Sequence, residues 1–216
     1  MRKRFGDRVV LENVSLSFEE GQLSGIMGPN GAGKSTCFNV LTGHFPPDDG
    51  QVLLAGEDIT GLSPLRIARK GVARSFQTIS LFDEFTALEN VLVALPAVRS
   101  VGMGANADVR CGSLPYGERR ALDIAVALAA QPRILFLDEP TQGMGADGRQ
   151  RLLTLIQRLK ARFTIVMIEH DMDFLFALAE QVSVIHWGQV IASGPPQRLR
   201  ENPWVRRSNL GVDSHA

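Results

Sequence analysis

Cysteine is scarce in this sequence, which contains Cys37 and Cys111 among its 216 residues. Two thiols do not make the disulfide framework that stabilises small secreted domains, so we expect both to be reduced in a cytosolic protein. A surplus of charge is also absent, because Lys and Arg together number 23, as do Asp and Glu. A neutral chain gives no electrostatic reason to expect nucleic acid as the main partner.

Long hydrophobic runs are missing as well. The basic start, Met1-Arg2-Lys3-Arg4, is not followed by an apolar stretch of signal-peptide length. The longest apolar stretches, at residues 125–130 and 134–137, are too short to cross a bilayer. The sequence contains no internal repeat and no low-complexity tract. Any role at a membrane is therefore expected to depend on a partner protein.

The composition that remains is typical of a globular protein, with 44% hydrophobic and 21% charged residues. A chain of 216 residues is long enough for one large α/β domain. Apolar runs rich in β-forming residues alternate with helical patterns, which favours a largely parallel sheet covered by helices.

The expected elements follow from periodicity and from turn residues. We predict strands, or a hairpin in the first case, at residues 9–18, 22–27, 51–54, 72–76, 133–137, 163–168, 182–187 and 190–192. We predict helices at residues 34–41, after Ser63-Pro64, after the capping box that begins at Thr86, and at 118–130, 149–159 and 171–180. Residues 100–112, rich in Gly, Ala and Asn, are interpreted as a loop.

A glycine-rich motif lies between the second predicted strand and the first predicted helix. Its residues, Gly28-Pro29-Asn30-Gly31-Ala32-Gly33-Lys34-Ser35, fit the pattern G-x-x-x-x-G-K-[ST]. The glycines let successive backbone N–H groups point at phosphate oxygens, and the helix presents its positive end to the same anion. Lys34 is expected to reach the β- and γ-phosphates and Ser35 to coordinate Mg²⁺. We predict a phosphate-binding site at these residues and at Thr36.

Two carboxylates, Asp138 and Glu139, follow the apolar strand predicted at residues 133–137. Ligands of open α/β folds bind at the carboxyl ends of the strands, so these side chains are placed beside the phosphate loop. Asp138 is expected to hold Mg²⁺, directly or through water, and Glu139 to polarise the attacking water. In isolation, the interpretation of both as helix-capping or solvated acids would have equal weight.

Two more polar residues follow predicted strands. His170 comes just after residues 163–168, so we expect it at the same sheet edge, where it would sense the γ-phosphate. Gln77 follows residues 72–76, and its amide oxygen is a suitable ligand for Mg²⁺ or for the attacking water. The Gln77 signal is weak by itself, because glutamine at a strand end is common.

In this order, the motifs resemble those of the ABC transporter ATPase family, over residues 5–211. The resemblance rests on a Walker A loop at residues 28–35, a Q-loop at Gln77, the signature-like Leu114-Pro115-Tyr116-Gly117-Glu118, a Walker B strand with Asp138 and Glu139, and a switch histidine at His170. Finer detail, including Arg119-Arg120 and residues 138–144, 168–172 and 202–205, resembles the ATP-binding subunits of branched-chain amino acid importers. Urea and amide importers share much of it.

The resemblance implies an ATPase that uses ATP and Mg²⁺. In the family, two ATPase subunits face each other head to tail, and each ATP lies between the Walker A loop of one and the signature of the other. Residues 114–118 would then bind the partner's ATP, and Phe5 would stack on adenine. Permease subunits, and indirectly a solute-binding protein, are the other implied partners, on the cytoplasmic face of the plasma membrane.

The implied fold is an α/β P-loop NTPase in one domain, residues 1–216. It has a mostly parallel sheet with flanking helices, an N-terminal antiparallel β portion and a helical subdomain at approximately residues 78–130. Because the 36 residues between Gln77 and Leu114 are fewer than in similar importers, we expect this subdomain to be reduced. The strand that commonly precedes Phe5 is mostly missing, which is compatible with a misplaced start or a truncation.

Two departures lie within the motifs. Pro115 stands where the signature usually has serine, and it has neither a hydroxyl nor an N–H group. Gly145 stands where the D-loop usually has aspartate. Similar importers often vary at the Gly145 position, but Pro115 and the short segment between Gln77 and Leu114 leave open a degraded subunit that binds ATP but hydrolyses it poorly.

Two further alternatives are a soluble ABC-type ATPase of translation or DNA repair, and a P-loop kinase or GTPase. The sequence has neither the fused duplication or long inserted arms of the former nor the guanine-reading N-K-x-D motif of the latter. The sequence does not identify the transported solute.

Overall fold

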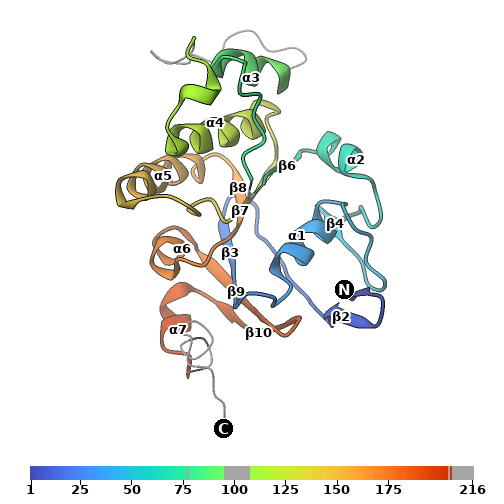
Figure 1. Cartoon of the computed structure of the whole chain (residues 1–216). Coiled ribbons are helices and arrows are strands. Elements are labelled where there is room, and N and C mark those ends of the chain that lie inside the picture. The colour runs from blue at the N-terminus through green and yellow to red at the C-terminus, as the bar shows by residue number, and fades with distance from the viewer. Residues whose placement is uncertain (77, 95–107, 204, 206–216) are drawn as a thin grey trace.

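The structure is a computed structural model that describes residues 1–76, 78–94, 108–203 and 205. Its centre is a six-stranded sheet with the strand order β10-β9-β3-β8-β7-β6. Five of these strands run parallel, and β10 pairs antiparallel with β9 at one edge. Helices lie on the faces of the sheet (Figure 1), so the predicted α/β arrangement is confirmed.

The bounds of the elements agree closely with the sequence pattern inside the sheet. The sheet strands are β3 (Leu23–Met27), β6 (Val72–Ser75), β7 (Ile134–Asp138), β8 (Thr164–Ile168), β9 (Gln181–His186) and β10 (Gln189–Gly194). The helices are α1 (Lys34–Leu41), α2 (Pro64–Arg69), α3 (Ala87–Ala94), α4 (Tyr116–Ala129), α5 (Ala146–Leu159), α6 (Met172–Leu178) and α7 (Pro196–Arg200), with a 3₁₀ turn at Cys111–Ser113. Strand β6, with Ser75 as its last residue, ends immediately before the Q-loop region.

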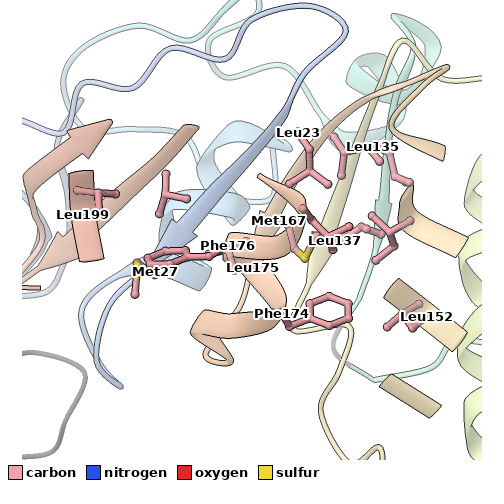
Figure 2. Packing of buried hydrophobic residues seen from close by; sticks show 14 of the residues in the cluster. Leu23, Met27, Leu135, Leu137, Leu152, Met167, Phe174, Leu175, Phe176 and Leu199 are labelled. Carbon is pink, nitrogen blue, oxygen red and sulfur yellow. The ribbon is translucent and has the colours of Figure 1, made fainter. Parts of the chain in front are cut away.

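Strands β3, β7 and β8 form because each is a short run of buried residues packed on both faces. Alternate residues of β7 belong to different cores. Leu135 and Leu137 pack with helices α5 and α6, whereas Phe136 packs against Phe38 of α1. Figure 2 shows the first of these clusters, in which Leu137 and Met167 lie near Phe174. The two-sided burial fixes the strand ends, and with them the residues that follow.

The N-terminal region is antiparallel, as predicted, but its strands are shorter than expected. Strand β1 (Lys3–Phe5) pairs with β2 (Arg8–Leu11), and β4 (Leu53–Leu54) pairs with β5 (Glu57–Asp58). The strand predicted over residues 9–18 ends at Leu11, because Asn13 has a positive φ of 53°. The backbone N–H of Val14 then bonds to the carbonyl of Met1 rather than to a neighbouring strand.

Helices α3 and α4 form a separate layer beyond the β6 end of the sheet (Figure 1). They pack around a small apolar cluster that includes Val91, Cys111 and Leu122. The predicted capping box at the start of α3 is confirmed, because Thr86 Oγ1 accepts from Glu89 N and Glu89 Oε2 accepts from Thr86 N. Most of the predicted loop at residues 100–112 lies outside the described residues.

Within the described ranges, no helix has the length and apolar character needed to span a membrane.

Candidate nucleotide-binding and catalytic site

The glycine-rich loop between β3 and α1 has a backbone that other residues would not adopt. Gly28 has φ 149°, and a Cβ built there would lie 2.0 Å from the carbonyl oxygen of Ile185. Gly33 has φ 103°, and its Cβ would lie 2.8 Å from Leu11 Cδ2 and 2.9 Å from the Val10 carbonyl oxygen. These glycines allow the loop to curl tightly against neighbouring strands before helix α1 begins at Lys34.

Lys34 lies inside the loop and is 5% exposed. Its Nζ donates to the carbonyl oxygens of Gly28, at 2.8 Å, and of Pro29, at 3.0 Å. Burial lowers the pKa of Lys34, while the nearby carboxylates of Glu139 and Asp138 act in the opposite direction. The ammonium group is therefore held where an anion entering the loop would meet it.

A cavity of about 310 Å³ opens beside this lysine. Three parts of the chain line it: the phosphate loop, the β1–β2 hairpin and the residue that follows β7. The lining residues are Phe5, Arg8, Val10, Asn30, Gly31, Gly33, Lys34, Ser35, Thr36 and Glu139. Phe5 is 44% exposed, with its ring edge-on to Phe45 at a centroid distance of 5.2 Å. Ala32 is buried behind the loop, where its carbonyl accepts from Gly188 N. The cavity thus has a cationic end and an aromatic wall.

Glu139 and His170, predicted to be catalytic, are in direct contact. The Nε2 atom of His170 lies 2.7 Å from Oε1 of Glu139. Glu139 directly follows β7 in a left-handed conformation, with φ 44°, and its N–H donates to the carbonyl of Ile168 in β8. This strained backbone turns the carboxylate out of the sheet plane toward the cavity that contains Lys34.

A second carboxylate, Glu169, organises this pair, and the sequence reasoning assigned it no role. Its side chain is almost completely buried and accepts from both the N–H and the hydroxyl of Thr141, at 2.9 and 2.5 Å. It also accepts from the N–H groups of His170 and Asp171. Glu169 therefore ties the segment after β7 to the segment after β8, which fixes the backbone on both sides of the His170–Glu139 contact.

Ser35 and Asp138, two of the predicted Mg²⁺ ligands, line a second cavity of about 380 Å³. The third, Gln77, lies outside the described residues, although its neighbours Phe76 and Thr78 line the same cavity. The Oδ1 atom of Asp138 is buried and has no hydrogen-bond partner among the described residues. A buried acceptor next to a serine hydroxyl fits a hard cation such as Mg²⁺.

The remaining ligands of the metal would come from nucleotide phosphates and water. Within the described parts of the chain, no group of three or more His, Cys, Asp and Glu side chains is arranged to hold a metal ion. Such a site fits Mg²⁺ that arrives with nucleotide phosphates and water, because Mg²⁺ keeps several waters and few protein ligands.

The signature residues lie at the start of helix α4 and, among the described residues, do not line the cavity around Lys34. Pro115 is the N-cap residue, and its carbonyl accepts from the N–H groups of Glu118 and Arg119. Pro115 and Tyr116 are exposed, while Leu114, Gly117 and Glu118 are half-buried. The first turn of α4 is therefore partly exposed and does not contribute to the cavity beside this chain's own Lys34.

Arg120, in the second turn of α4, is another buried charge that the motif pattern did not reveal. It is 1% exposed and donates to the backbone carbonyls of Phe76 and Asp138, the latter at 2.8 Å. It also lies 3.6 Å from the carboxylate of Asp123, which accepts from Ser75 Oγ. The signal in the sequence was its position four residues before the buried Ile124, on the inward face of the helix.

A buried strand, a glycine-rich loop with a lysine and a following helix define the class of P-loop nucleotide-binding proteins. Residues 11–142 match the family model that is described as "ABC transporter". The chain belongs to the ABC transporter family. The predicted family and fold class are therefore confirmed.

Several similar proteins match nearly the full length of this chain. The high-affinity branched-chain amino acid transport ATP-binding protein BraF of Pseudomonas aeruginosa is 38% identical, over 96% of this chain and 94% of its own. LivG of Escherichia coli, with the same description, is 35% identical over the same shares. The lipopolysaccharide export system ATP-binding protein LptB of Acidithiobacillus ferridurans is also 35% identical, over 97% of this chain and 93% of its own.

Solved structures agree with the sequence relatives. A nucleotide-free ATP-binding cassette from an ABC transporter superposes with a TM-score of 0.87 at 28% identity, covering 97% of this chain and 96% of that one. A cassette in its ADP conformation has the same values. This chain is an ATP-binding subunit of an ABC transporter and an ATPase, which sets aside the kinase and GTPase alternatives.

Proposed function

We propose that this chain hydrolyses ATP to drive a branched-chain amino acid importer. The observation that carries the ATPase part is the placement of Lys34, Glu139 and the phosphate loop around one cavity, with His170 bonded to Glu139. The solute is proposed from relatives that are 35–38% identical and carry that transport description. LptB has a similar identity, so the solute is the part that needs a direct test.

That test is transport by the assembled complex. We would express the chain with the permeases encoded beside it, reconstitute the complex in vesicles with the cognate solute-binding protein, and follow ATP-dependent uptake of labelled leucine. Uptake of leucine with no uptake of urea or short amides is the expected result. Uptake of urea or an amide instead would reassign the solute to that importer class while leaving the ATPase proposal intact.

In the proposed site, the phosphate loop and Lys34 bind the phosphates and Phe5 stacks on the adenine. Ser35 and Asp138 hold Mg²⁺ together with Gln77. When bound, the metal neutralises charge on the β- and γ-phosphates. Glu139 takes the position of the base that orients the attacking water.

His170 is proposed to hold Glu139 through the observed contact and to sense the γ-phosphate. The intact pair supports an active enzyme over the alternative of a degraded subunit that binds ATP but hydrolyses it poorly.

A second ATPase subunit is proposed to complete each ATP site. The exposure of Pro115 and Tyr116, together with their absence from the lining of the chain's own nucleotide cavity, supports a role for residues 114–118 on a partner's nucleotide. The N–H groups in the first turn of α4 would face the γ-phosphate of that ATP. Because Pro115 lacks a hydroxyl, backbone groups and the helix dipole would supply this contact.

An apolar groove of about 290 Å³ is the proposed docking surface for a permease helix. It lies between α2 and β6 on one side and the end of α4 on the other, and its lining includes Ile67, Phe76 and Val126. Docking there would place the chain peripherally on the cytoplasmic face of the membrane, with the solute-binding protein as an indirect partner.

We also propose that the helical subdomain, approximately residues 78–130 of a single domain spanning 1–216, is reduced. The alignment with BraF occupies 240 positions, more than the 216 residues of this chain, which supports missing segments. A smaller subdomain offers fewer anchors, so permease association should be weak while nucleotide binding is intact. Inserting the corresponding segment of a relative should then increase permease recovery in a pull-down, and equal recovery would contradict the proposal.

A further inference from the structure

A buried arginine, Arg74 of strand β6, occupies the wall of the proposed metal cavity. Its side chain is 8% exposed. One guanidinium nitrogen, NH2, donates to Oδ2 of Asp138 at 2.7 Å. The other, NH1, donates to Oδ1 of Asn39 at 2.7 Å and to Oγ1 of Thr42 at 3.1 Å.

These bonds join the two elements that carry Ser35 and Asp138, two of the three proposed Mg²⁺ ligands. Asn39 lies in helix α1, one turn after Ser35, and Asp138 ends strand β7. Arg74 itself lies three residues before Gln77. The guanidinium is further confined between aromatic rings, 5.6 Å from the centroid of Phe38 and 4.9 Å from that of Phe76. A planar, five-donor group held in this way fixes the separation of α1 from β7.

The two carboxylate oxygens of Asp138 differ in their hydrogen bonding. Oδ2 is bonded to Arg74, whereas Oδ1 is buried without a hydrogen-bond partner in the described part of the chain. The Asp138 side chain is 5% exposed, so without Arg74 its buried charge would lose its ion-pair partner and keep only the more distant influence of Lys34 and Arg120. Removing one partner of a buried ion pair is strongly destabilising for that reason.

We propose that Arg74 is a positioning residue of the Mg²⁺ site, acting as the resident cation that compensates Asp138 before the metal arrives. It holds Oδ2 and thereby presents Oδ1 to the metal or to its bound water. The inference rests on the proposed function, because it takes Asp138 as part of the metal site. Arg120 provides a contrast, since it is even more buried but bonds the backbone carbonyl of Asp138 instead of its carboxylate.

The proposal predicts how Mg²⁺ changes the melting temperature of the protein. In the unchanged protein, Asp138 is compensated with or without metal, so adding Mg²⁺ to the nucleotide-bound protein should raise the melting temperature modestly. In Arg74→Gln the carboxylate has no ion-pair partner until Mg²⁺ binds, and only the more distant Lys34 and Arg120 act on it. The melting temperature should then fall by roughly 10 °C in the absence of metal, and Mg²⁺ should restore about half of that loss or more.

The experiment measures thermal unfolding of the full chain with no additive, with ADP and EDTA, and with ADP and MgCl₂ at matched ionic strength. The variants are Arg74→Gln, the control Arg120→Gln, and the double variant Arg74→Gln/Asp138→Asn, which removes both charges of the pair. The metal increment is the rise in melting temperature when MgCl₂ replaces EDTA in the presence of ADP. We expect it to be large in Arg74→Gln. We expect it to be small in the unchanged protein, in Arg120→Gln and in the double variant. No ATP turnover is needed for this readout.

Two other outcomes would overturn the inference. If ADP shifts the melting temperature and the metal increment is the same in Arg74→Gln as in Arg120→Gln, Arg74 has a general structural role and the inference is overturned. If ADP produces no shift in the unchanged protein, the proposed nucleotide site fails, and the inference fails with it. Should Arg74→Gln not fold, Arg74→Lys retains the charge without the two-sided bonding and should show an intermediate metal increment. An increment equal to that of the unchanged protein would overturn the positioning role.

Discussion

Nε2 of His170 lies 2.7 Å from Oε1 of Glu139, although the two residues follow different strands and are separated by 31 positions in the chain. The contact exists because β7 and β8 are adjacent and in parallel register, with Asp138 opposite Ile168. Glu139 and His170 therefore follow the two strands within one residue of the same level at this edge of the sheet. The contact gives the carboxylate a fixed neighbour, an arrangement that suits the proposed role of Glu139 in aligning a water molecule.

Replacement of Glu139 should separate binding from hydrolysis. We expect Glu139→Gln to bind ATP with nearly unchanged affinity and to hydrolyse it about 10²–10⁴-fold more slowly, because the amide cannot act as a base. The variant should also accumulate as an ATP-bound dimer in gel filtration. Phosphate release and elution volume are the measurements, with Glu57→Gln on the surface as the control. A monomeric Glu139→Gln with normal turnover would disprove the assignment.

Lys34 should be needed for nucleotide affinity. Its ammonium lies inside the loop and would contact two phosphates, each worth about 1.5–3 kcal/mol as a charge-assisted hydrogen bond. Lys34→Ala should therefore weaken binding of a non-hydrolysable ATP analogue by roughly 100-fold or more in calorimetry. Lys70→Ala, which removes an exposed ion pair with Glu57, serves as the matched control. Equal affinities for the two variants would contradict the phosphate-loop assignment.

The loop should also tolerate no side chain at Gly28. A Cβ there would lie 2.0 Å from the Ile185 carbonyl oxygen, so Gly28→Ala must displace either the loop or strand β9. We expect a fall in melting temperature of roughly 10 °C or loss of soluble protein. Gly61→Ala tests strain alone, because Gly61 has φ 69° and nothing within 4 Å of its Cβ position. That change should cost about 1–2 kcal/mol, and similar losses for both variants would show that the clash is relieved cheaply.

Pro115 can be replaced by the residue more usual in signatures. Helix α4 has no side-chain cap bond at its N-cap residue, and a serine there would accept from an N–H group of the first turn. Pro115→Ser should raise stability by about 0.5–2 kcal/mol, judged from urea unfolding, and leave ATPase activity equal or higher. A large loss of activity on this change would reveal a positive role for proline.

The sequence predicted the residues whose chemistry is local. Lys34 and Ser35 follow from a short string, and Glu139 and His170 from their positions after apolar strands. Arg74, Arg120 and Glu169 were not predicted, because each is a single charged residue whose partners come from other elements. Charged residues in a sequence are usually exposed, so helical spacing hinted at the burial of Arg120, whereas the burial of Arg74 and Glu169 became visible only from their partners in other elements.

The early strand shows a similar limit. Its apolar pattern continued past Leu11, but the backbone of Asn13 turned the chain away from β1. Alternation of residue types does not specify where pairing stops when a tertiary contact, here Val14 with Met1, takes over the hydrogen bonding.

Strands β6 and β7 are neighbours in the sheet, and the 58 residues from 76 to 133 connect them. For a polymer, the entropy lost on closing such a connection grows with the logarithm of its length. A segment one third longer would therefore raise the free energy of closure by roughly 0.3 kcal/mol. The entropy of closing the sheet thus places almost no constraint on the size of this segment, so its length is free to vary with what the segment contacts, which under the proposed function is the permease.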